Sequence, residues 1–299
     1  MQSLSHIKTL LESRGLRPKR SLGQNFLVDH NLIRKLVDAS GVRPGDVVLE
    51  VGPGTGTMTE ELLARGCRVV ACELDDELAA ILAETIGHDP ANAGRFTLVH
   101  RDCLEGKDDL APELIEAIRT ASHAAGKQGV FHLVANLPYG AATPLMTNLL
   151  LDHPECPVLA VTIQREVADR LMAGPGSKDY GALAVIAQAM ASVTRVALAP
   201  PECFWPRPEV TSAMVLLRRR ADPLTTDHVG LSAFCRTIFA QRRKQIGSLL
   251  ANSSAAPINW ASFAENPPAG CGGIVPTLRA EQLTPAQVIA LGRALGRIA

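Results

Sequence analysis

Short apolar runs along the chain alternate with segments in which apolar residues recur every three or four positions. The second pattern is typical of helices with one buried face, and it covers residues 57–66, 75–87 and 109–125. A further helix is expected to begin at Thr143-Pro144, because proline is favoured in the first turn of a helix. The apolar runs predict seven strands, at residues 47–52, 68–74, 95–102, 132–137, 158–164, 193–199 and 213–219.

The order of these elements predicts an α/β fold. The first five runs are nearly continuous in apolar residues and are separated by helices, which is the pattern of a mostly parallel sheet covered on both faces. The last two runs are joined by the proline-rich PPECFWPRPEV, which leaves no room for a crossover helix, so we expect an antiparallel edge. After Arg220 the chain becomes helical. We therefore predict a seven-stranded α/β domain over residues 1–221 and a small helical domain over residues 222–299.

Composition narrows the functional classes. The hydrophobic fraction of 46% and the charged fraction of 20% are those of an ordinary globular protein, and no apolar run is long enough to span a bilayer. The N-terminal residues mix acidic and basic side chains without a signal-peptide core, so a cytoplasmic protein is expected. The seven cysteines are scattered without a C-x-x-C pair, which favours reduced, buried thiols over disulfides or a metal site.

A glycine-rich turn follows the first predicted strand, in the sequence Glu50-Val-Gly-Pro-Gly-Thr-Gly56. Glycines allow a sharp entry into a helix and a close approach of backbone to a ligand. Their spacing at every second position differs from the dinucleotide fingerprint, and no Gly-Lys-Ser/Thr follows as in a P-loop. Thr57 and Glu60 have the spacing of a capping box for the next helix. A bare glycine turn without a ligand remains the alternative.

The next two strand ends carry acidic residues, which weakens that alternative. Glu73 ends the second strand, where nucleoside sites of α/β proteins place a carboxylate to bind the ribose hydroxyls. Asp102 ends the third strand, where a carboxylate could accept a hydrogen bond from an adenine amino group. A single acid at a strand end is usually solvated. Three successive strand ends that contribute to one crevice at the carboxyl edge of the sheet favour a nucleoside-binding site.

The fourth strand ends in Asn136-Leu-Pro-Tyr139. The amino nitrogen of adenine is a poor nucleophile because its lone pair is delocalised into the ring. A neutral acceptor such as the Asn136 side chain, helped by the Leu137 carbonyl, could bind the amino hydrogens and orient the nitrogen toward an electrophile. Pro138 would make the turn rigid, and Tyr139 offers a ring on which a base can stack. A structural proline turn with a buried tyrosine is the alternative for this motif taken alone.

These motifs together resemble a known family. EVGPGTGTMTEEL, ACELD, HRD and ANLPY are similar to the motifs of class I S-adenosylmethionine-dependent methyltransferases that modify adenine N6 in nucleic acids. SLGQNFLVD, TIQREVADRL, FWPRPEVTSAMV and FAQRRK resemble the ribosomal small-subunit RNA adenine dimethyltransferases, from about residue 7 to the last helix. The resemblance implies a Rossmann-like fold and transfer of two methyl groups to each of two adjacent adenines in the 3′-terminal hairpin of 16S rRNA.

The resemblance also assigns roles to residues. Asn25 and Leu27 would close over the methionine end of S-adenosylmethionine. Tyr139 and Phe204 would be the stacking faces of the target-base pocket, and Asn136 would contact both cofactor and target. The full cofactor set it implies is Asn25, Leu27, Gly52, Gly54, Glu73, Asp102 and Asn136, and the catalytic set is Asn136, Tyr139 and Phe204.

Nucleic-acid binding must come from local charge, because 30 basic residues balance 30 acidic ones. Arg242, Arg243 and Lys244 form a cluster near a helix start and are predicted to contact RNA phosphates, with the RRR run at 218–220 as the second candidate. Solvated surface charge is the other interpretation of such clusters. The expected partner is small-subunit rRNA within a pre-30S particle. The protein is expected to act as a monomer and to bind no membrane.

Two other functions share parts of this pattern. A 23S rRNA adenine methyltransferase of the antibiotic-resistance type has a similar fold and a similar asparagine-proline turn, but the Leu137 in this turn and the F-x-P-x-P stretch argue against it. A non-catalytic assembly factor for the small subunit is the alternative outside enzymes. The intact Glu73, Asp102 and Asn136 argue against a complete loss of catalysis.

Overall fold

The computed structural model describes residues 1–106, 109–241, 243–251 and 259–299 of the chain. Within these residues the strands are β1 Phe26–Leu27, β2 Val47–Val51, β3 Arg68–Glu73, β4 Phe96–His100, β5 Leu104–Glu105, β6 Asp109–Leu110, β7 His132–Asn136, β8 Val158–Gln164, β9 Ala191–Ala199, β10 Phe204–Trp205 and β11 Ser212–Arg219. The α-helices are α1 Leu4–Glu12, α2 His30–Ser40, α3 Thr57–Ala64, α4 Asp76–Leu82, α5 Pro112–Ala124, α6 Tyr139–Asp152, α7 Arg165–Met172, α8 Ala182–Met190, α9 His228–Phe239, α10 Ile246–Ala251, α11 Trp260–Glu265 and α12 Pro285–Ala294.

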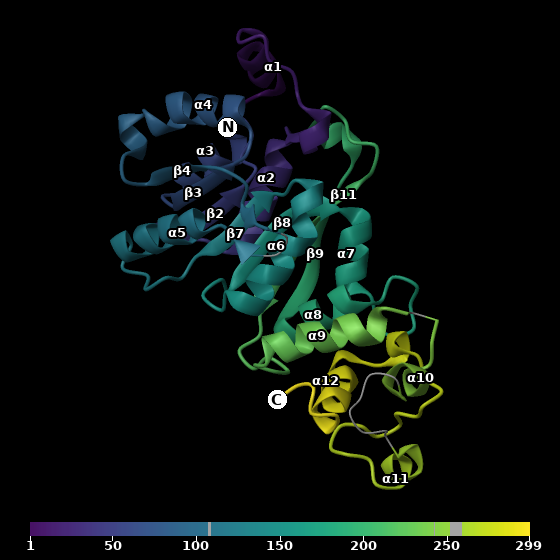
Figure 1. The fold of residues 1–299 in the computed structure, drawn as a ribbon. Helices are drawn as coiled ribbons and strands as arrows, with labels where there is room; N and C mark the ends of the chain where they lie inside the picture. Colours follow the sequence, from purple (N-terminus) through teal and green to yellow (C-terminus); the bar gives the residue numbers. More distant parts are fainter. Residues whose placement is uncertain (107–108, 242, 252–258) are drawn as a thin grey trace. The chain divides into compact units, whose positions relative to one another are not determined.

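The main sheet has seven strands in the order β4-β3-β2-β7-β8-β11-β9 (Figure 1). The strand pairs from β4 to β8 are parallel, and β11 is antiparallel to β8. All seven predicted strands are present, so the predicted α/β class with an antiparallel edge is confirmed. The chain runs outward from β2 to β4 and then returns to β7 beside β2, which makes the carboxyl ends of β2 and β7 the point where the strand order reverses. Ligands of open α/β sheets bind at such points.

Both faces of the parallel strands are covered by helices. Val48, Val69 and Val134 belong to one buried cluster with side chains of α2 and α3. Because successive side chains of a strand point to opposite faces, the neighbouring Leu49 and Val70 face the other layer, and both are fully buried. Helix α5 packs against β2, β3 and β4. The sequence of β2, β3 and β7 is mostly apolar because both faces of these strands are largely buried, whereas the edge strand β4 is partly exposed.

Helix α3 begins differently from the prediction. Its N-cap is Gly56, at φ 93°, and no side chain caps the helix, so the predicted capping box of Thr57 and Glu60 is wrong. Glu60 instead accepts a hydrogen bond from the Gln2 side chain at 2.9 Å. The left-handed glycine leads the backbone into the first turn, which places Thr57 inside the helix rather than at its cap.

Helix α6 begins earlier than predicted. It begins at Tyr139, directly after the N-cap Pro138, and Pro144 lies inside it. The carbonyl of Pro138 accepts hydrogen bonds from the amides of Ala141 and Ala142 at 3.1 and 3.2 Å, so the first turn is complete before Thr143 is reached. The predicted start at Thr143-Pro144 is therefore wrong, and Tyr139 is fixed in a helix rather than in a loop.

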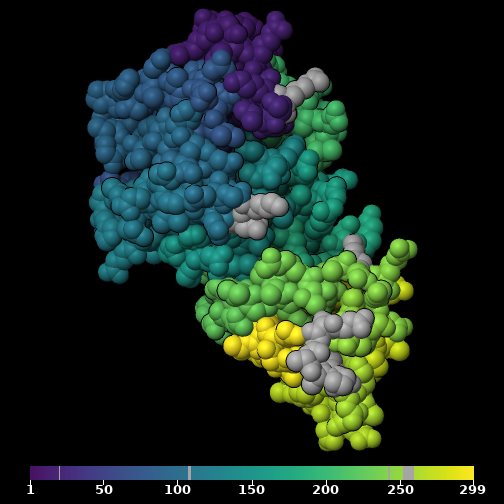
Figure 2. All heavy atoms as spheres, viewed as in Figure 1, coloured from purple at the N-terminus to yellow at the C-terminus, as the bar shows by residue number. Residues whose placement is uncertain are grey.

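The N-terminal helix α1 covers part of the sheet domain. Its buried Ile7 and Leu11 pack in a cluster with Phe26, Leu78 and Ile81. In the space-filling view the purple N-terminal residues lie against the blue residues that follow β3 (Figure 2). This cluster supports the segment of chain that follows α1.

The chain divides into two compact units. The first contains residues 1–149, 153–168 and 194–218, and the second contains 150–152, 169–193 and 219–299. In the second unit α8 packs on α9 and α12, and the Tyr180 hydroxyl donates to the Leu283 carbonyl at 2.7 Å. Thr284 and Gln287 form a capping box at the start of α12. Residues 169–193 thus pack with the helical part although they precede residue 221, and the assignment of two functional domains with a boundary at 221 stays a prediction.

Candidate active site

A cavity of about 570 Å³ lies where the strand order of the main sheet reverses. Its walls come from the carboxyl ends of β2, β3 and β7, from the segment after β4 and from residues 21–27. All nine residues predicted for the cofactor and the target base line it: Asn25, Leu27, Gly52, Gly54, Glu73, Asp102, Asn136, Tyr139 and Phe204. Their roles stay predictions, but the fold does bring them to one place.

The glycine turn forms the floor of the cavity as bare backbone. Gly52 and Gly54 have φ values of 69° and 63°, in the left-handed region that favours glycine. A Cβ atom on Gly52 would lie 2.9 Å from Pro138, and one on Gly54 would lie 2.8 Å from the ring of Phe26. Any side chain at these positions would therefore push apart the turn and the two segments that cover it.

Glu73 is held in place by backbone amides. Its Oε1 accepts from the amides of Leu74 and Asp75, both at 3.0 Å, and its Oε2 accepts from Gly54 at 3.2 Å. The side chain is buried, and this burial raises the pKa of Glu73, while the three amide donors oppose the rise. The carboxylate is thus oriented before any ligand arrives.

Asp102 is the exposed acid of the site. It follows β4, and its Oδ1 accepts from the Leu104 amide at 3.0 Å. The neighbouring Arg101 forms an ion pair with Glu113 of α5. This pair holds the segment after β4 to the helix that follows, so Asp102 lies at a fixed edge of the cavity.

The Asn136 side chain has a defined orientation. Its Nδ2 donates to the backbone carbonyl of Asn25 at 3.0 Å. Because a carbonyl can only accept, this contact requires the amide nitrogen at that end and leaves Oδ1 with its acceptor capacity. The neighbouring Leu137 amide donates to the Thr162 carbonyl at 3.1 Å, which fixes the strand end itself.

Tyr139 and Phe204 are also fixed by neighbouring strands. The Tyr139 hydroxyl and the Ser212 hydroxyl of β11 share a hydrogen bond of 2.9 Å. Burial raises the pKa of Tyr139, and the bond with Ser212 opposes that rise, so the phenol stays neutral. Phe204 pairs with Leu27 in the short antiparallel sheet of β1 and β10, where it is only 3% exposed. Both rings therefore line the cavity from rigid positions.

A buried carboxyl group lies beneath the glycine turn. Glu50 lines the cavity at only 2% exposure, and the Thr59 hydroxyl donates to its Oε2 at 2.7 Å. Burial raises the pKa of Glu50 to about 8, the Thr59 bond opposes the rise, and the charge of Glu73 adds to it. No role was predicted for Glu50 from the sequence, although it is the one polar residue of the otherwise apolar strand β2.

Comparison with known proteins identifies the family. The sequence pattern of the family described as ribosomal RNA adenine dimethylase matches residues 15–263. The chain belongs to this family. Membership confirms the predicted resemblance and the prediction of a methyltransferase that acts on ribosomal RNA adenine.

Curated relatives of the dimethylase family cover nearly the whole chain. The "Ribosomal RNA small subunit methyltransferase A" of Streptomyces coelicolor is 41% identical over 283 residues, which are 93% of this chain and 91% of the relative. The protein of the same name from Mycobacterium bovis is 40% identical over 266 residues, 86% of this chain and 76% of the relative. Both names refer to the small subunit, so the 23S alternative is not favoured.

Solved structures support the fold of the dimethylase family. A dimethyladenosine transferase from Plasmodium falciparum superposes with a TM-score of 0.67 at 18% identity, over 91% of this chain and 98% of that one. The 23S rRNA methyltransferase ErmE superposes with a TM-score of 0.62 at 25% identity, over 91% of this chain and all of that one. The predicted Rossmann-like methyltransferase fold is thus confirmed.

The contacts of the basic cluster with RNA stay a prediction. Arg243 and Lys244 lie on the exposed turn between α9 and α10, and Arg242 lies outside the described residues. Among the residues that the structure describes, no helix is long and apolar enough to cross a membrane. In the same part of the chain no three His, Cys, Asp or Glu side chains gather as a metal site would require.

Proposed function

We propose that this dimethylase transfers methyl groups from S-adenosylmethionine to the N6 atoms of two adjacent adenines in the 3′-terminal hairpin of 16S rRNA. The product is N6,N6-dimethyladenine at both positions. The observation that carries this proposal is the Asn136 amide at the switch point of the sheet, with its oxygen left as an acceptor in a cavity of about 570 Å³. We further propose that the protein acts as a monomer on the pre-30S particle in the cytoplasm.

The chain's own residues fit S-adenosylmethionine. The bare backbone of Gly52 and Gly54 gives room for the amino-acid portion of the cofactor. The fixed Glu73 carboxylate suits two ribose hydroxyls, and Asp102 suits the adenine amino group. Asn25 and Leu27 cover the site from the N-terminal side. When bound, the cofactor supplies a methyl group on positively charged sulfur, which is the electrophile of the reaction.

Asn136 supplies orientation rather than a base. Its Oδ1, together with the Leu137 carbonyl, accepts the two amino hydrogens of the target adenine and turns the nitrogen lone pair out of the ring plane. A neutral amide suffices because the nitrogen becomes acidic only as the new N–C bond forms, after which its proton can pass to solvent. Holding the nitrogen in this geometry removes an entropic part of the barrier.

Tyr139 and Phe204 hold the base. An adenine in a hairpin must leave its stack before its amino group can enter a cavity, and aromatic side chains replace the lost stacking. Tyr139 is fixed through Ser212 and Phe204 through Leu27, so neither ring has to be ordered when the base binds. Arg243, Lys244 and their neighbour Arg242 would hold RNA phosphates and set the register of the hairpin.

The decisive experiment uses small subunits that lack the modification. They are incubated with the protein and radiolabelled S-adenosylmethionine, and the labelled base is mapped. Label in the two adjacent adenines of the 16S hairpin is the expected result. Label in 23S rRNA would support the large-subunit alternative, and binding without label would support the assembly-factor alternative.

A second experiment tests the cofactor site alone. Calorimetry with S-adenosylhomocysteine should show binding that Glu73→Ala weakens by about tenfold or more, because a charged acceptor is lost from the ribose. Glu116→Ala, on the exposed face of α5, is the matched control and should bind as the wild type does. Equal binding by Glu73→Ala would remove Glu73 from the ribose role.

A further inference from the structure

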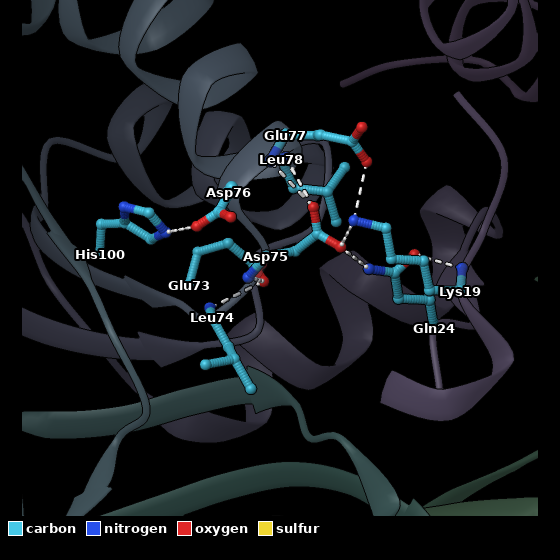
Figure 3. A network of polar contacts seen from close by, with 9 residues as sticks. All are labelled: Lys19, Gln24, Glu73, Leu74, Asp75, Asp76, Glu77, Leu78 and His100. Carbon is cyan, nitrogen blue, oxygen red and sulfur yellow. Dashed lines mark hydrogen bonds and ion pairs between the residues drawn. The ribbon is translucent and has the colours of Figure 1, made fainter. Parts of the chain in front are cut away.

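Residues 19–27 are here called the strap, and residues 21–27 of it line the cavity. The side chains of Gln24 and Lys19 tie the strap to the segment that follows β3. Gln24 donates from Nε2 to Oδ2 of Asp75 at 2.9 Å, and its Oε1 accepts from the Lys19 backbone amide at 2.7 Å. Figure 3 shows this network with Glu73 and Asp75 next to each other at the strand end. The Gln24 contact therefore joins the strap to the segment next to Glu73, the carboxylate proposed to bind the ribose.

The Asp75 carboxylate is almost fully enclosed, and each of its oxygens has two donors. Its side chain is 1% exposed, and Oδ2 also accepts from Lys19 Nζ at 2.8 Å. Oδ1 caps helix α4 by accepting from the amides of Glu77 and Leu78 at 3.0 and 3.2 Å. Burial alone would raise the pKa of Asp75, but the Lys19 bond and the other donors hold it below its ordinary value. The carboxylate is thus charged and satisfied only while the strap is in place.

A second contact joins the strap to the reacting end of the cavity. The carbonyl of Asn25, the residue after Gln24, accepts the hydrogen bond that orients the Asn136 amide. Phe26 then pairs with Trp205 and stacks on its ring at 6.1 Å, and the same Phe26 ring lies against Gly54. One peptide bond therefore separates the tie to β3 from the contact to Asn136. A shift of Gln24 moves the Asn25 carbonyl with it.

We propose that Gln24 and Asp75 form a latch that keeps the strap closed over the cofactor and, through the Asn25 carbonyl, sets the orientation of the Asn136 amide. Both are positioning residues, since Asp75 acts through Gln24 and Gln24 acts through Asn25. The inference rests on the proposed function, because the closed strap covers the proposed cofactor cavity. It adds that release of the cofactor product requires the latch to open.

The competing interpretation is that Asp75 serves only as the cap of α4, and one substitution separates the two. Asp75→Asn keeps an oxygen for the cap, because asparagine caps helices as well as aspartate does. It places an NH₂ group where Oδ2 now meets Gln24 and Lys19, so three donors face one another and the latch is lost. Gln24→Leu removes the same contact from the other side with a side chain of similar size. Asp89→Asn is the matched control, because Asp89 caps only the short helix that begins at Pro90.

The first measurement uses the unliganded protein. Hydrogen exchange followed by mass spectrometry should show the peptide over residues 19–28 exchanging about tenfold faster or more in Asp75→Asn and Gln24→Leu, because a charge-assisted bond is lost. Asp89→Asn should exchange at the wild-type rate. The double variant should be no faster than Asp75→Asn alone, since that substitution already breaks the Gln24 contact.

The second measurement is the rate at which S-adenosylhomocysteine leaves. Trp205 stacks on the strap, so stopped-flow fluorescence of a Trp260→Phe background follows the opening. Both latch variants should release the ligand about tenfold faster and lower kcat, with thermal unfolding close to that of Asp89→Asn.

The outcomes separate the latch from the function on which it rests. A wild-type protein that does not bind S-adenosylhomocysteine contradicts the proposed cofactor site itself. Binding by the wild type, with strap exchange and ligand release unchanged in both variants, overturns the latch alone. If only Asp75→Asn has an effect and Gln24→Leu has none, the Lys19 ion pair of Asp75 holds the strap without Gln24, and the latch is again overturned.

Discussion

Replacing Glu50 by glutamine should stabilise the unliganded protein, and the gain should grow with pH. The side chain is 2% exposed, and burial is the main cause that raises its pKa from the ordinary 4.5 to about 8. Glutamine has nearly the same shape and keeps an oxygen for the Thr59 hydroxyl, which now donates at 2.7 Å. The substitution thus removes the titration and leaves the packing.

The size of the effect follows from proton linkage. A carboxyl group whose pKa is higher in the folded state favours folding below its unfolded pKa, and this contribution is lost as pH rises from about 4.5 to about 8. At pH 7 the interval above the ordinary pKa is about 2.5 pH units, which at about 1.4 kcal/mol per unit sets an upper limit of about 3.5 kcal/mol. Because the unfolded carboxyl group is only half ionised at pH 4.5, the wild type loses about 3 kcal/mol of unfolding free energy between pH 4.5 and pH 7. The Glu50→Gln variant should not show this loss of stability.

The assay is urea unfolding of ligand-free wild type and Glu50→Gln at a series of pH values from 4.5 to 8. The difference in the free energy of unfolding should be small at the acid end and reach about 3 kcal/mol at pH 7. Glu116→Gln, exposed on α5, is the control and should follow the wild-type curve. A difference that stays constant over this range, or a loss of stability in Glu50→Gln, would refute the reasoning, because Glu50 would then be charged and compensated in the fold.

Three further predictions concern the reaction. Asn136→Ala should lower the single-turnover methylation rate more than it lowers rRNA affinity, because the acceptor is needed most as the nitrogen attacks; a wild-type rate would make the motif a structural turn. Tyr139→Phe and Ser212→Ala break the same hydrogen bond, so each should keep much of the activity and the pair should be no worse than either, whereas Tyr139→Ala should lose stacking of about 1–3 kcal/mol in base binding. Replacing Arg243 and Lys244 by alanine should weaken subunit binding and reduce its logarithmic salt slope by about 2, and an unchanged slope would move the docking surface elsewhere.

The sequence predicted the sheet well because its central strands are buried on both faces. Residues 133–135 and 158–161, for example, are all apolar and buried, and that pattern has few alternatives. The predicted capping box at Thr57 and the predicted helix start at Thr143 were wrong because local cap preferences were overridden. At Thr57 the left-handed Gly56 determines the first turn, and at Thr143 the turn is already closed from Pro138.

The candidate residues gathered as expected because carboxyl ends of parallel strands meet at one edge of a sheet. The contacts that orient them could not be predicted from local patterns. Gln24 and Asp75 are 51 residues apart, and Asn25 and Asn136 are 111 residues apart. Such contacts depend on how the strap packs across the sheet. A local sequence motif does not predict which acidic residue the Gln24 side chain will bind.

The hydrogen bond from the Leu137 amide to the Thr162 carbonyl has a consequence for the chemical lifetime of the protein. Asparagine side chains deamidate when the backbone nitrogen of the next residue attacks their carbonyl carbon. At Asn136 that nitrogen belongs to Leu137, and the sheet keeps it engaged and in line with the strand. Deamidation would create the Asn136→Asp change, in which a carboxylate faces the Asn25 carbonyl and both groups can only accept. The strand pair that positions the amide thus also slows its spontaneous decay, and heat-aged samples should lose Asn136 only where β7 and β8 have separated.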